Sequence, residues 1–162
     1  MPIFRLLFIA MLSSAWCLAL LGLRFEWSGQ TWFSFMAWNL FLAGIPLCIA
    51  VVLNKTERWR FATPLIAGWL LFFPNAPYVL TDLLHLKERG GVPLWFDLLM
   101  LLSFALVSLW MGLQSLQLVQ LWIAEKMSRL AAWGFVAVSL LLSGFGIYLG
   151  RFLRWNSWDI IR

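Results

Sequence analysis

Long apolar stretches separated by short polar ones dominate the chain. A transmembrane α-helix needs about 20 predominantly apolar residues, and four stretches approach or exceed that length, at about 4–23, 32–53, 93–123 and 131–153. A fifth stretch, about 61–86, is also apolar but is broken by prolines within 74–77. The pattern predicts an all-α membrane protein, a multi-pass bundle of four full transmembrane helices plus one proline-broken segment, in a single domain over 1–162.

The broken segment contains two prolines close together. Its first apolar piece, LIAGWLLFF at 65–73, would span about 14 Å as a helix, which is half of a hydrocarbon core. Pro74 and Pro77 each lack a backbone donor and clash with the preceding turn. Asn75 is a residue type suited to capping a second helix after the break. The sequence therefore predicts two half-helices that meet at PNAP.

The distribution of Lys and Arg residues bears on whether this segment crosses the membrane. Cytoplasmic loops carry an excess of these residues. If the segment turns back, nine of the twelve lie on one side, and the other keeps only Arg24, Lys126 and Arg129. If it crosses as a kinked helix, they divide six and six. The charge distribution favours a re-entrant segment with both termini in the cytoplasm, and a bundle of five full helices is the alternative.

The composition agrees with a membrane location. Of the 162 residues, 63% are hydrophobic and 12% are charged, about half the charged fraction of a soluble domain. The net charge is +5, and most basic residues flank apolar stretches. They therefore indicate membrane topology and contact with anionic lipid headgroups. No basic cluster alternates with aromatic residues on a polar surface, so no nucleic-acid partner is expected.

Polar residues gather in the second half of the broken segment and at the ends of two other helices. Spacings of three, four and three place Asn75, Tyr78, Asp82 and His85 on one helical face. The helices at 93–123 and 131–153 form a hairpin, so the start of the first and the end of the second share one membrane side. That side carries a further set of polar residues: Asp97, Arg151, Arg154, Asn156 and Asp159. Because ionisable groups in membrane segments are costly, this convergence predicts a functional site for a ligand or a headgroup.

Structural explanations compete with the functional one. Asp97 suits the positive end of a helix dipole, and Asp82 with Arg151 or Arg154 would form a packing ion pair. His85 would be solvated, and the two arginines would snorkel at the interface. Asn39 lies inside an apolar stretch and needs a hydrogen-bond partner, which a carbonyl freed by Pro46 would supply; its expected role is buried polar packing.

Several kinds of chemistry have no support in the sequence. There is a single histidine, and no Gly-rich phosphate loop, CxxC or G-x-S-x-G motif is present. A divalent ion held by Asp82, His85 and Asp97 is not favoured. We expect neither a metal nor a cofactor.

Four motifs in order along the chain carry a family resemblance: WNLFLAGIP, FFPNAPYVLTDLLHL, VPLWFDLL and GIYLGRFLRWNSWDI. Over roughly residues 36–160 the chain resembles the bacterial membrane family called domain of unknown function (DUF) 1361. The resemblance implies a multi-pass inner-membrane protein and supplies no mechanism. Such proteins usually continue past the RWNSWD motif into a further helix, whereas this sequence ends at Arg162; it is therefore expected to be a short member or a truncated chain.

Three hypotheses for the function follow. The leading one is a non-catalytic membrane subunit that binds anionic lipid headgroups or a partner subunit, with Arg151 and Arg154 as donors and Asp82 and Asp97 holding them. The first alternative is a membrane-embedded enzyme on a lipid or polyprenyl phosphate, with His85 as acid/base oriented by Asp82. The second alternative is a small proton-coupled transporter with its site at the broken helix.

Overall fold

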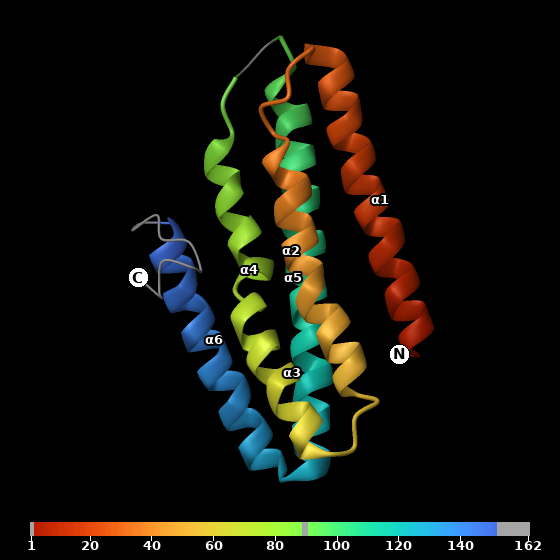
Figure 1. Cartoon of the computed structure of the whole chain (residues 1–162). Helices are drawn as coiled ribbons and strands as arrows, with labels where there is room; N and C mark the ends of the chain where they lie inside the picture. Colours follow the sequence, from red (N-terminus) through yellow and green to blue (C-terminus); the bar gives the residue numbers. More distant parts are fainter. Residues whose placement is uncertain (1, 89–90, 152–162) are drawn as a thin grey trace.

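The computed structural model describes residues 2–88 and 91–151 and is all-α over them. Its helices are α1 (Ile3–Ser28), α2 (Phe35–Leu53), α3 (Trp59–Phe72), α4 (Asn75–Tyr78), the 3₁₀ helix η1 (Val79–His85), α5 (Leu94–Lys126) and α6 (Arg129–Arg151). Four of them, α1, α2, α5 and α6, are long and apolar enough to cross a membrane. The predicted all-α multi-pass bundle is thus confirmed, and Figure 1 shows its helices running roughly side by side.

Helix α1 extends beyond the apolar stretch that predicted it. It ends at Ser28, where Gly29 adopts a left-handed conformation (φ 62°) and donates its backbone N–H to the Phe25 carbonyl. Glycine reaches this conformation without steric cost and commonly ends helices in this way. The last turn is held by packing as well, because the ring of Trp27 meets that of Phe96 on α5 edge-on at 5.6 Å.

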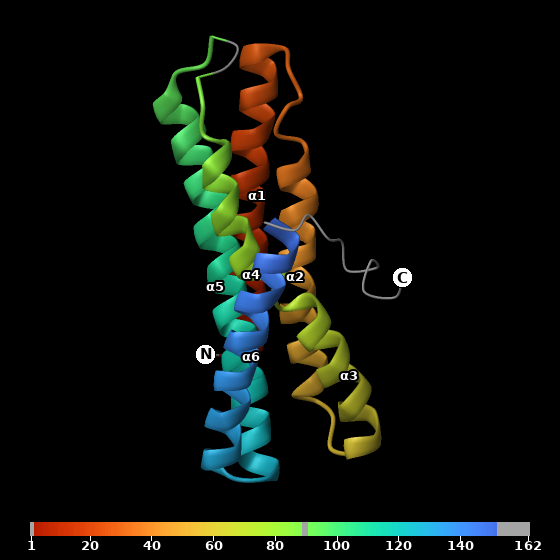
Figure 2. The ribbon, with the colours of Figure 1, turned by 90° about the vertical axis from the view of Figure 1, so that its left-hand side faces the viewer.

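The broken segment runs the length of the bundle without turning back. Its contacts with α5 move steadily toward the start of α5 as the chain advances. Trp59 packs on Trp122, with ring centroids 4.8 Å apart, and Trp69 Nε1 donates to Ser115 Oγ at 3.2 Å. Ala76 then lies against Gly112. Figures 1 and 2 show the same single direction through α3, α4 and η1.

The re-entrant topology expected from the charge distribution is therefore wrong. It would have placed Arg24 and Asp97 at opposite ends of the bundle, yet their side chains form a salt bridge with Nε and Oδ1 2.6 Å apart. The kinked segment passes once along the bundle. With this topology the Lys and Arg residues of the chain divide equally between the two sides and favour neither orientation. The expectation of both termini on the cytoplasmic side loses its basis with it.

The break lies at Phe73 and Pro74, as the prolines predicted, but Asn75 does not cap the following helix. No side-chain cap is present on α4. Asn75 Nδ2 instead donates to the Phe72 carbonyl at 2.9 Å. Proline removes backbone donors and leaves carbonyls without helical partners, so the amide supplies a donor near the break instead of closing the start of a new helix.

Two glycines let the segment around the break pack closely between α5 and α6. A Cβ on Gly112 would lie 2.7 Å from the Cβ of Ala76, and a Cβ on Gly146 would lie 3.3 Å from that of Pro74. Small residues at helix contacts are typical of membrane bundles, where close backbone approach provides the packing energy. These contacts hold α4 in place and so position η1, which carries Asp82 and His85.

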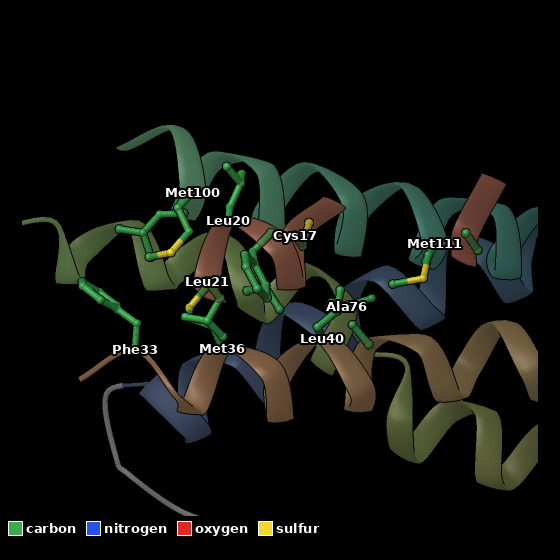
Figure 3. Packing of buried hydrophobic residues seen from close by; sticks show 14 of the residues in the cluster. Cys17, Leu20, Leu21, Phe33, Met36, Leu40, Ala76, Met100 and Met111 are labelled. Atoms are coloured by element: carbon green, nitrogen blue, oxygen red, sulfur yellow. The ribbon is translucent and has the colours of Figure 1, made fainter. Parts of the chain in front are cut away.

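The hydrophobic core has two parts. One joins α1, the first half of α2, α4 and the first half of α5; Figure 3 shows Cys17, Leu40, Met100 and other members interdigitating there. The other joins the end of α2, α3, the second half of α5 and α6, around the fully buried Trp69. Many large apolar side chains on the outer surface, including Phe4 at 78% exposure and Leu130 at 84%, face outward as expected for contact with lipid.

Candidate functional site

Asp82 is the buried carboxylate at the centre of one polar cluster. Only 2% of it is exposed, and Asn39 Nδ2 on α2 donates to its Oδ2 at 2.8 Å. The partner expected for Asn39 was a carbonyl freed by Pro46, and that expectation is wrong. The amide bonds across to η1, because a buried carboxylate is a stronger acceptor than a neutral carbonyl.

The winding of η1 aligns Asp82 with His85. A 3₁₀ helix has three residues per turn and a rise of about 2.0 Å per residue, so positions three apart eclipse one another about 6 Å apart. Val79, Asp82 and His85 therefore share one line on the helix, and Val79 and Asp82 are both buried. The imidazole of His85 lies against the ring of Phe35 at the start of α2, with centroids 5.3 Å apart.

Arg151, the last residue of α6, completes this cluster. Its Nη1 lies 3.3 Å from His85 Nε2. A guanidinium has donors and no acceptor, so the contact is a hydrogen bond only when Nε2 is unprotonated and accepts. Both His85 and Arg151 lie near enough to Asp82 to act on its charge. We call Asn39, Asp82, His85 and Arg151 the α2–η1–α6 cluster.

The second polar contact is a buried ion pair between α1 and α5. Arg24 on α1 and Asp97 in the first turn of α5 are 1% and 0% exposed. Arg24 Nε and Nη2 donate to the two carboxylate oxygens at 2.6 and 3.3 Å, and Arg24 Cζ lies 5.4 Å from the centroid of the Phe33 ring. The guanidinium is thus held by a forked contact to one carboxylate, the geometry that suits a buried pair.

The polar residues predicted to converge at one interface fall into separate groups. Asp82, His85 and Arg151 come together, whereas Asp97 bonds to Arg24 and not to Arg151. Helices α5 and α6 form the predicted hairpin, but α6 is shorter: Figure 1 shows α5 beginning at the top of the bundle and α6 ending lower, just above its middle. The neighbouring α1 provides a nearer cation for Asp97, and so the expected single site is divided.

The remaining predicted positions do not join the cluster or lie outside the described chain. Asn75 donates to a backbone carbonyl next to the helix break. Tyr78 is half-buried on α4, and its carbonyl accepts from the Thr81 hydroxyl at 2.7 Å. Three predicted positions lie outside the described residues: Arg154, Asn156 and Asp159.

Arg24 is the buried charged residue whose partner the sequence does not predict. By its position in the sequence it is a charge that flanks an apolar stretch. The signal for the pair is placement: in the crossing topology Arg24, directly after the apolar stretch 4–23, and Asp97, inside the stretch 93–123, lie at the same end of the bundle. A charge in such a setting needs a partner of opposite sign, so the two form a pair as soon as the topology is known.

The described residues contain no group of three or more His, Cys, Asp or Glu side chains placed to hold a metal ion. In the three-residue set considered from the sequence, Asp97 is engaged by Arg24. The α2–η1–α6 cluster accordingly offers one guanidinium in contact with one imidazole and, nearby, one carboxylate that accepts from an amide.

Fold and site together define a multi-pass all-α membrane protein with a polar cluster among otherwise apolar helices. The chain belongs to the family described as protein of unknown function (DUF1361), whose family model matches residues 38–162. The match begins within α2 and continues through α6, so it includes every member of the cluster and leaves out the whole of α1. No curated protein and no solved structure matches the chain.

Proposed function

We propose that this protein is a non-catalytic membrane-embedded binding protein and that its α2–η1–α6 cluster binds the phosphate of an anionic lipid headgroup through Arg151. One observation carries the proposal. Nη1 of the Arg151 guanidinium lies 3.3 Å from His85 Nε2, and no carboxylate of the described residues forms a salt bridge with the guanidinium. Within the described part of the chain, an imidazole and not a carboxylate therefore holds this cation.

The geometry around Arg151 suits a phosphate. A guanidinium presents five N–H donors in a fixed fork, which matches the oxygens of a phosphate. The His85 contact uses one of its nitrogens. Asp82 already accepts from Asn39, which fixes the nearby carboxylate on η1. Phosphate oxygens on the remaining donors would complete the hydrogen bonding of a half-buried cation.

The position of the cluster suits a headgroup. Arg151 ends α6, His85 ends η1, and Phe35 begins α2, so the cluster lies near one end of three helices. Arginines at such positions lay their aliphatic stem along apolar surface and hold the charged group at the membrane boundary. The motif resemblance supports a bacterial inner membrane as the location, and an adjoining membrane subunit is a further ligand that the same surface would accept.

The enzyme hypothesis finds less support in the geometry. It requires His85 to be oriented by a hydrogen bond that its ring N–H donates to the Asp82 carboxylate. In the structure His85 Nε2 contacts Arg151 and Asp82 accepts from Asn39. Each candidate catalytic group is thus bonded to another residue. The hydrogen bond between His85 and Asp82 that the enzyme hypothesis requires is not formed among the described residues.

The transport hypothesis has one feature in its favour. The junction between α3 and α4 lies near the middle of the bundle, where transporters place discontinuous helices (Figure 1). Ala76 and Pro74, however, pack directly against Gly112 and Gly146, so protein fills the space beside the break. Binding at the end of the bundle therefore has the better support.

Lipid retention tests the proposal. The protein would be reconstituted in bilayers containing equal amounts of phosphatidylglycerol and phosphatidylcholine, and the lipids retained after detergent extraction counted by native mass spectrometry. We expect the wild type to retain phosphatidylglycerol preferentially and Arg151→Gln to lose a factor of about five in that preference, the amount that one basic residue contributes near an anionic surface. Arg5→Gln, which removes an exposed arginine of α1, serves as the control.

Two further arms separate the sources of phosphate and the roles of the residue. Inorganic phosphate at millimolar concentration should not displace the lipid, whereas displacement would assign the site to a free anion. Arg151→Lys should restore part of the preference because it keeps the charge and loses the fork. Equal lipid preference in wild type, Arg151→Gln and Arg5→Gln would overturn the proposal.

A further inference from the structure

The kink at Pro74 opens a space at the other end of the bundle. Figure 2 shows α3 diverging from α6 below the break. Between them lies a cavity of about 340 Å³. It is lined from α3 by Trp59 and Ile66, from the end of α5 by Met127, and from α6 by Ala131 and Phe135, among others. We call this space the α3–α6 wedge.

The chemistry of the lining selects an alkyl occupant. Apart from Thr63, the side chains around the wedge are apolar or aromatic. The hydroxyl of Thr63 donates to the Trp59 carbonyl at 2.9 Å, so it is already satisfied by its own helix. A wedge of this volume lies at the small end of ligand pockets, and a helix about 10 Å across does not fit it. A single flexible hydrocarbon chain does.

Charge at this end selects the headgroup that such a chain would carry. Five basic and two acidic residues lie in or next to the α2–α3 and α5–α6 connections: Lys55, Arg58, Arg60, Lys126, Arg129, Glu57 and Glu125. Lys126 is engaged by Glu125 at 3.4 Å. Arg58 and Arg60 flank the wedge residue Trp59, and Arg129 lies between Met127 and Ala131 in the chain. The surroundings of the wedge are therefore basic.

Tryptophans place the wedge at the level of the lipid headgroups. Trp59 and Trp133 are 45% and 63% exposed at this end of α3 and α6. Exposed tryptophans concentrate at the boundary between hydrocarbon and water. A lipid whose headgroup lies at that boundary extends its chains into the adjoining hydrocarbon, in the direction in which α3 and α6 converge (Figure 2).

From these observations we infer that the α3–α6 wedge binds one acyl chain of an anionic phospholipid, whose phosphate contacts Arg58, Arg60 and Arg129. The site is distinct from the α2–η1–α6 cluster and lies at the opposite end of the bundle. The inference does not depend on the function proposed for that cluster. It assigns a purpose to the proline break: the change of direction at Pro74 separates α3 from α6 and so creates the space.

Filling the wedge tests the inference. Ala131→Phe places an aromatic ring in the wedge, whereas Ala137→Phe makes the same change at an exposed position of the same helix. The protein would be reconstituted in phosphatidylglycerol bilayers carrying a trace of phosphatidylglycerol with a photoreactive acyl chain. We expect wild type and Ala137→Phe to label peptides containing Met127 and Phe135 in a saturable way, and Ala131→Phe to lose that saturable labelling.

The headgroup is tested separately. Replacing Arg58, Arg60 and Arg129 with Gln should lower the competition by unlabelled phosphatidylglycerol, relative to phosphatidylcholine, by a factor of about five for each arginine that contacts the phosphate. Two results would overturn the inference: saturable labelling that persists in Ala131→Phe, or competition by phosphatidylcholine as effective as that by phosphatidylglycerol in the wild type. Arg151→Gln reports on the other site, so failure of one proposal is visible independently of the other.

Discussion

The two polar contacts in the upper half of the bundle use similar residue types and differ in whether the arginine is paired directly with a carboxylate. Arg24 and Asp97 are almost fully buried and satisfy each other through two hydrogen bonds. Arg151 is half-buried, and its partner among the described residues is a ring nitrogen of His85. One arginine meets a carboxylate directly, and the other is held beside a carboxylate that accepts from Asn39.

The difference separates a structural role from a binding role. A buried ion pair whose donors and acceptors are used within the fold has little left to offer a ligand, and removing one partner leaves an uncompensated charge. A cation positioned by a neutral group keeps donors for an incoming anion. Judged by burial alone, Arg24 and Asp97 would be the stronger candidate for a functional site. Because their side chains bond to each other, their role is to join α1 to α5.

The largest expected effect is on the closed pair. Arg24→Met leaves the Asp97 carboxylate buried without its cation, and we expect a loss of about 3–5 kcal/mol in the free energy of unfolding. Steric trapping in detergent or bicelles would measure it. The cost arises from desolvation: Asp97 has 0% exposure, so water cannot replace the missing guanidinium.

The double variant Arg24→Met with Asp97→Leu sharpens this prediction. It replaces the pair with apolar groups of similar size, and buried pairs replaced in this way often lose little stability. We expect it to recover most of the loss. A single variant that loses less than about 1 kcal/mol would place the pair among weak, solvent-exposed contacts and would remove the contrast between the two sites.

An intermediate effect is expected where the break is packed. Gly112→Ala would bring its Cβ to 2.7 Å from the Cβ of Ala76, and overpacking of this kind costs about 1–3 kcal/mol. Gly134→Ala on α6 has no atom within 4 Å of the new Cβ and should be neutral or stabilising, since alanine favours helix. Thermal unfolding of both variants in the same detergent would compare them. Equal unfolding temperatures would show that α4 does not rest on Gly112.

A smaller effect is expected within the α2–η1–α6 cluster. Asn39→Ala removes the donor to Asp82, and we expect a loss of about 1–2 kcal/mol because the carboxylate is buried and the amide is half-buried. Asn54→Ala, which removes a side-chain amide bonded to backbone carbonyls at the far end of α2, is a matched control with a loss of about 1 kcal/mol or less. The same unfolding measurement applies. Equal losses would mean that the Asp82 contact is no more demanding than a helix-end contact.

Hydrophobic patterning was enough to predict the helices whose ends are set by their local sequence. The stretches behind α2, α5 and α6 are long, apolar and bounded by polar residues, so their ends came within a few residues of the structure. The end of α1 was set by Gly29 and by Trp27 packing on Phe96. Packing of that kind depends on a distant helix and leaves no mark in the local pattern.

Topology and partners were harder to predict than elements. The prolines located the break, but they do not say whether the chain reverses there, and the charge distribution pointed the wrong way. Pairing Arg24 with Asp97 required the correct topology first. The line of Val79, Asp82 and His85 required the 3₁₀ winding of η1, and seven consecutive 3₁₀ residues are uncommon enough that an α-helical spacing is the natural expectation.

The smallest expected effect on stability belongs to His85, and it makes the contrast between the two arginines sharpest. His85→Phe keeps an aromatic ring against Phe35, whose centroid lies 5.3 Å away, and removes the acceptor for Arg151. We expect the free energy of unfolding to change by less than about 0.5–1 kcal/mol, while the preference for phosphatidylglycerol falls because the guanidinium is no longer positioned. His85→Asn, whose side-chain oxygen can accept from a guanidinium, should retain more of the preference at the cost of the ring contact. If His85→Phe destabilised the protein as much as Arg24→Met while lipid preference stayed the same, Arg151 would have to be regarded as a second structural residue, equivalent to Arg24.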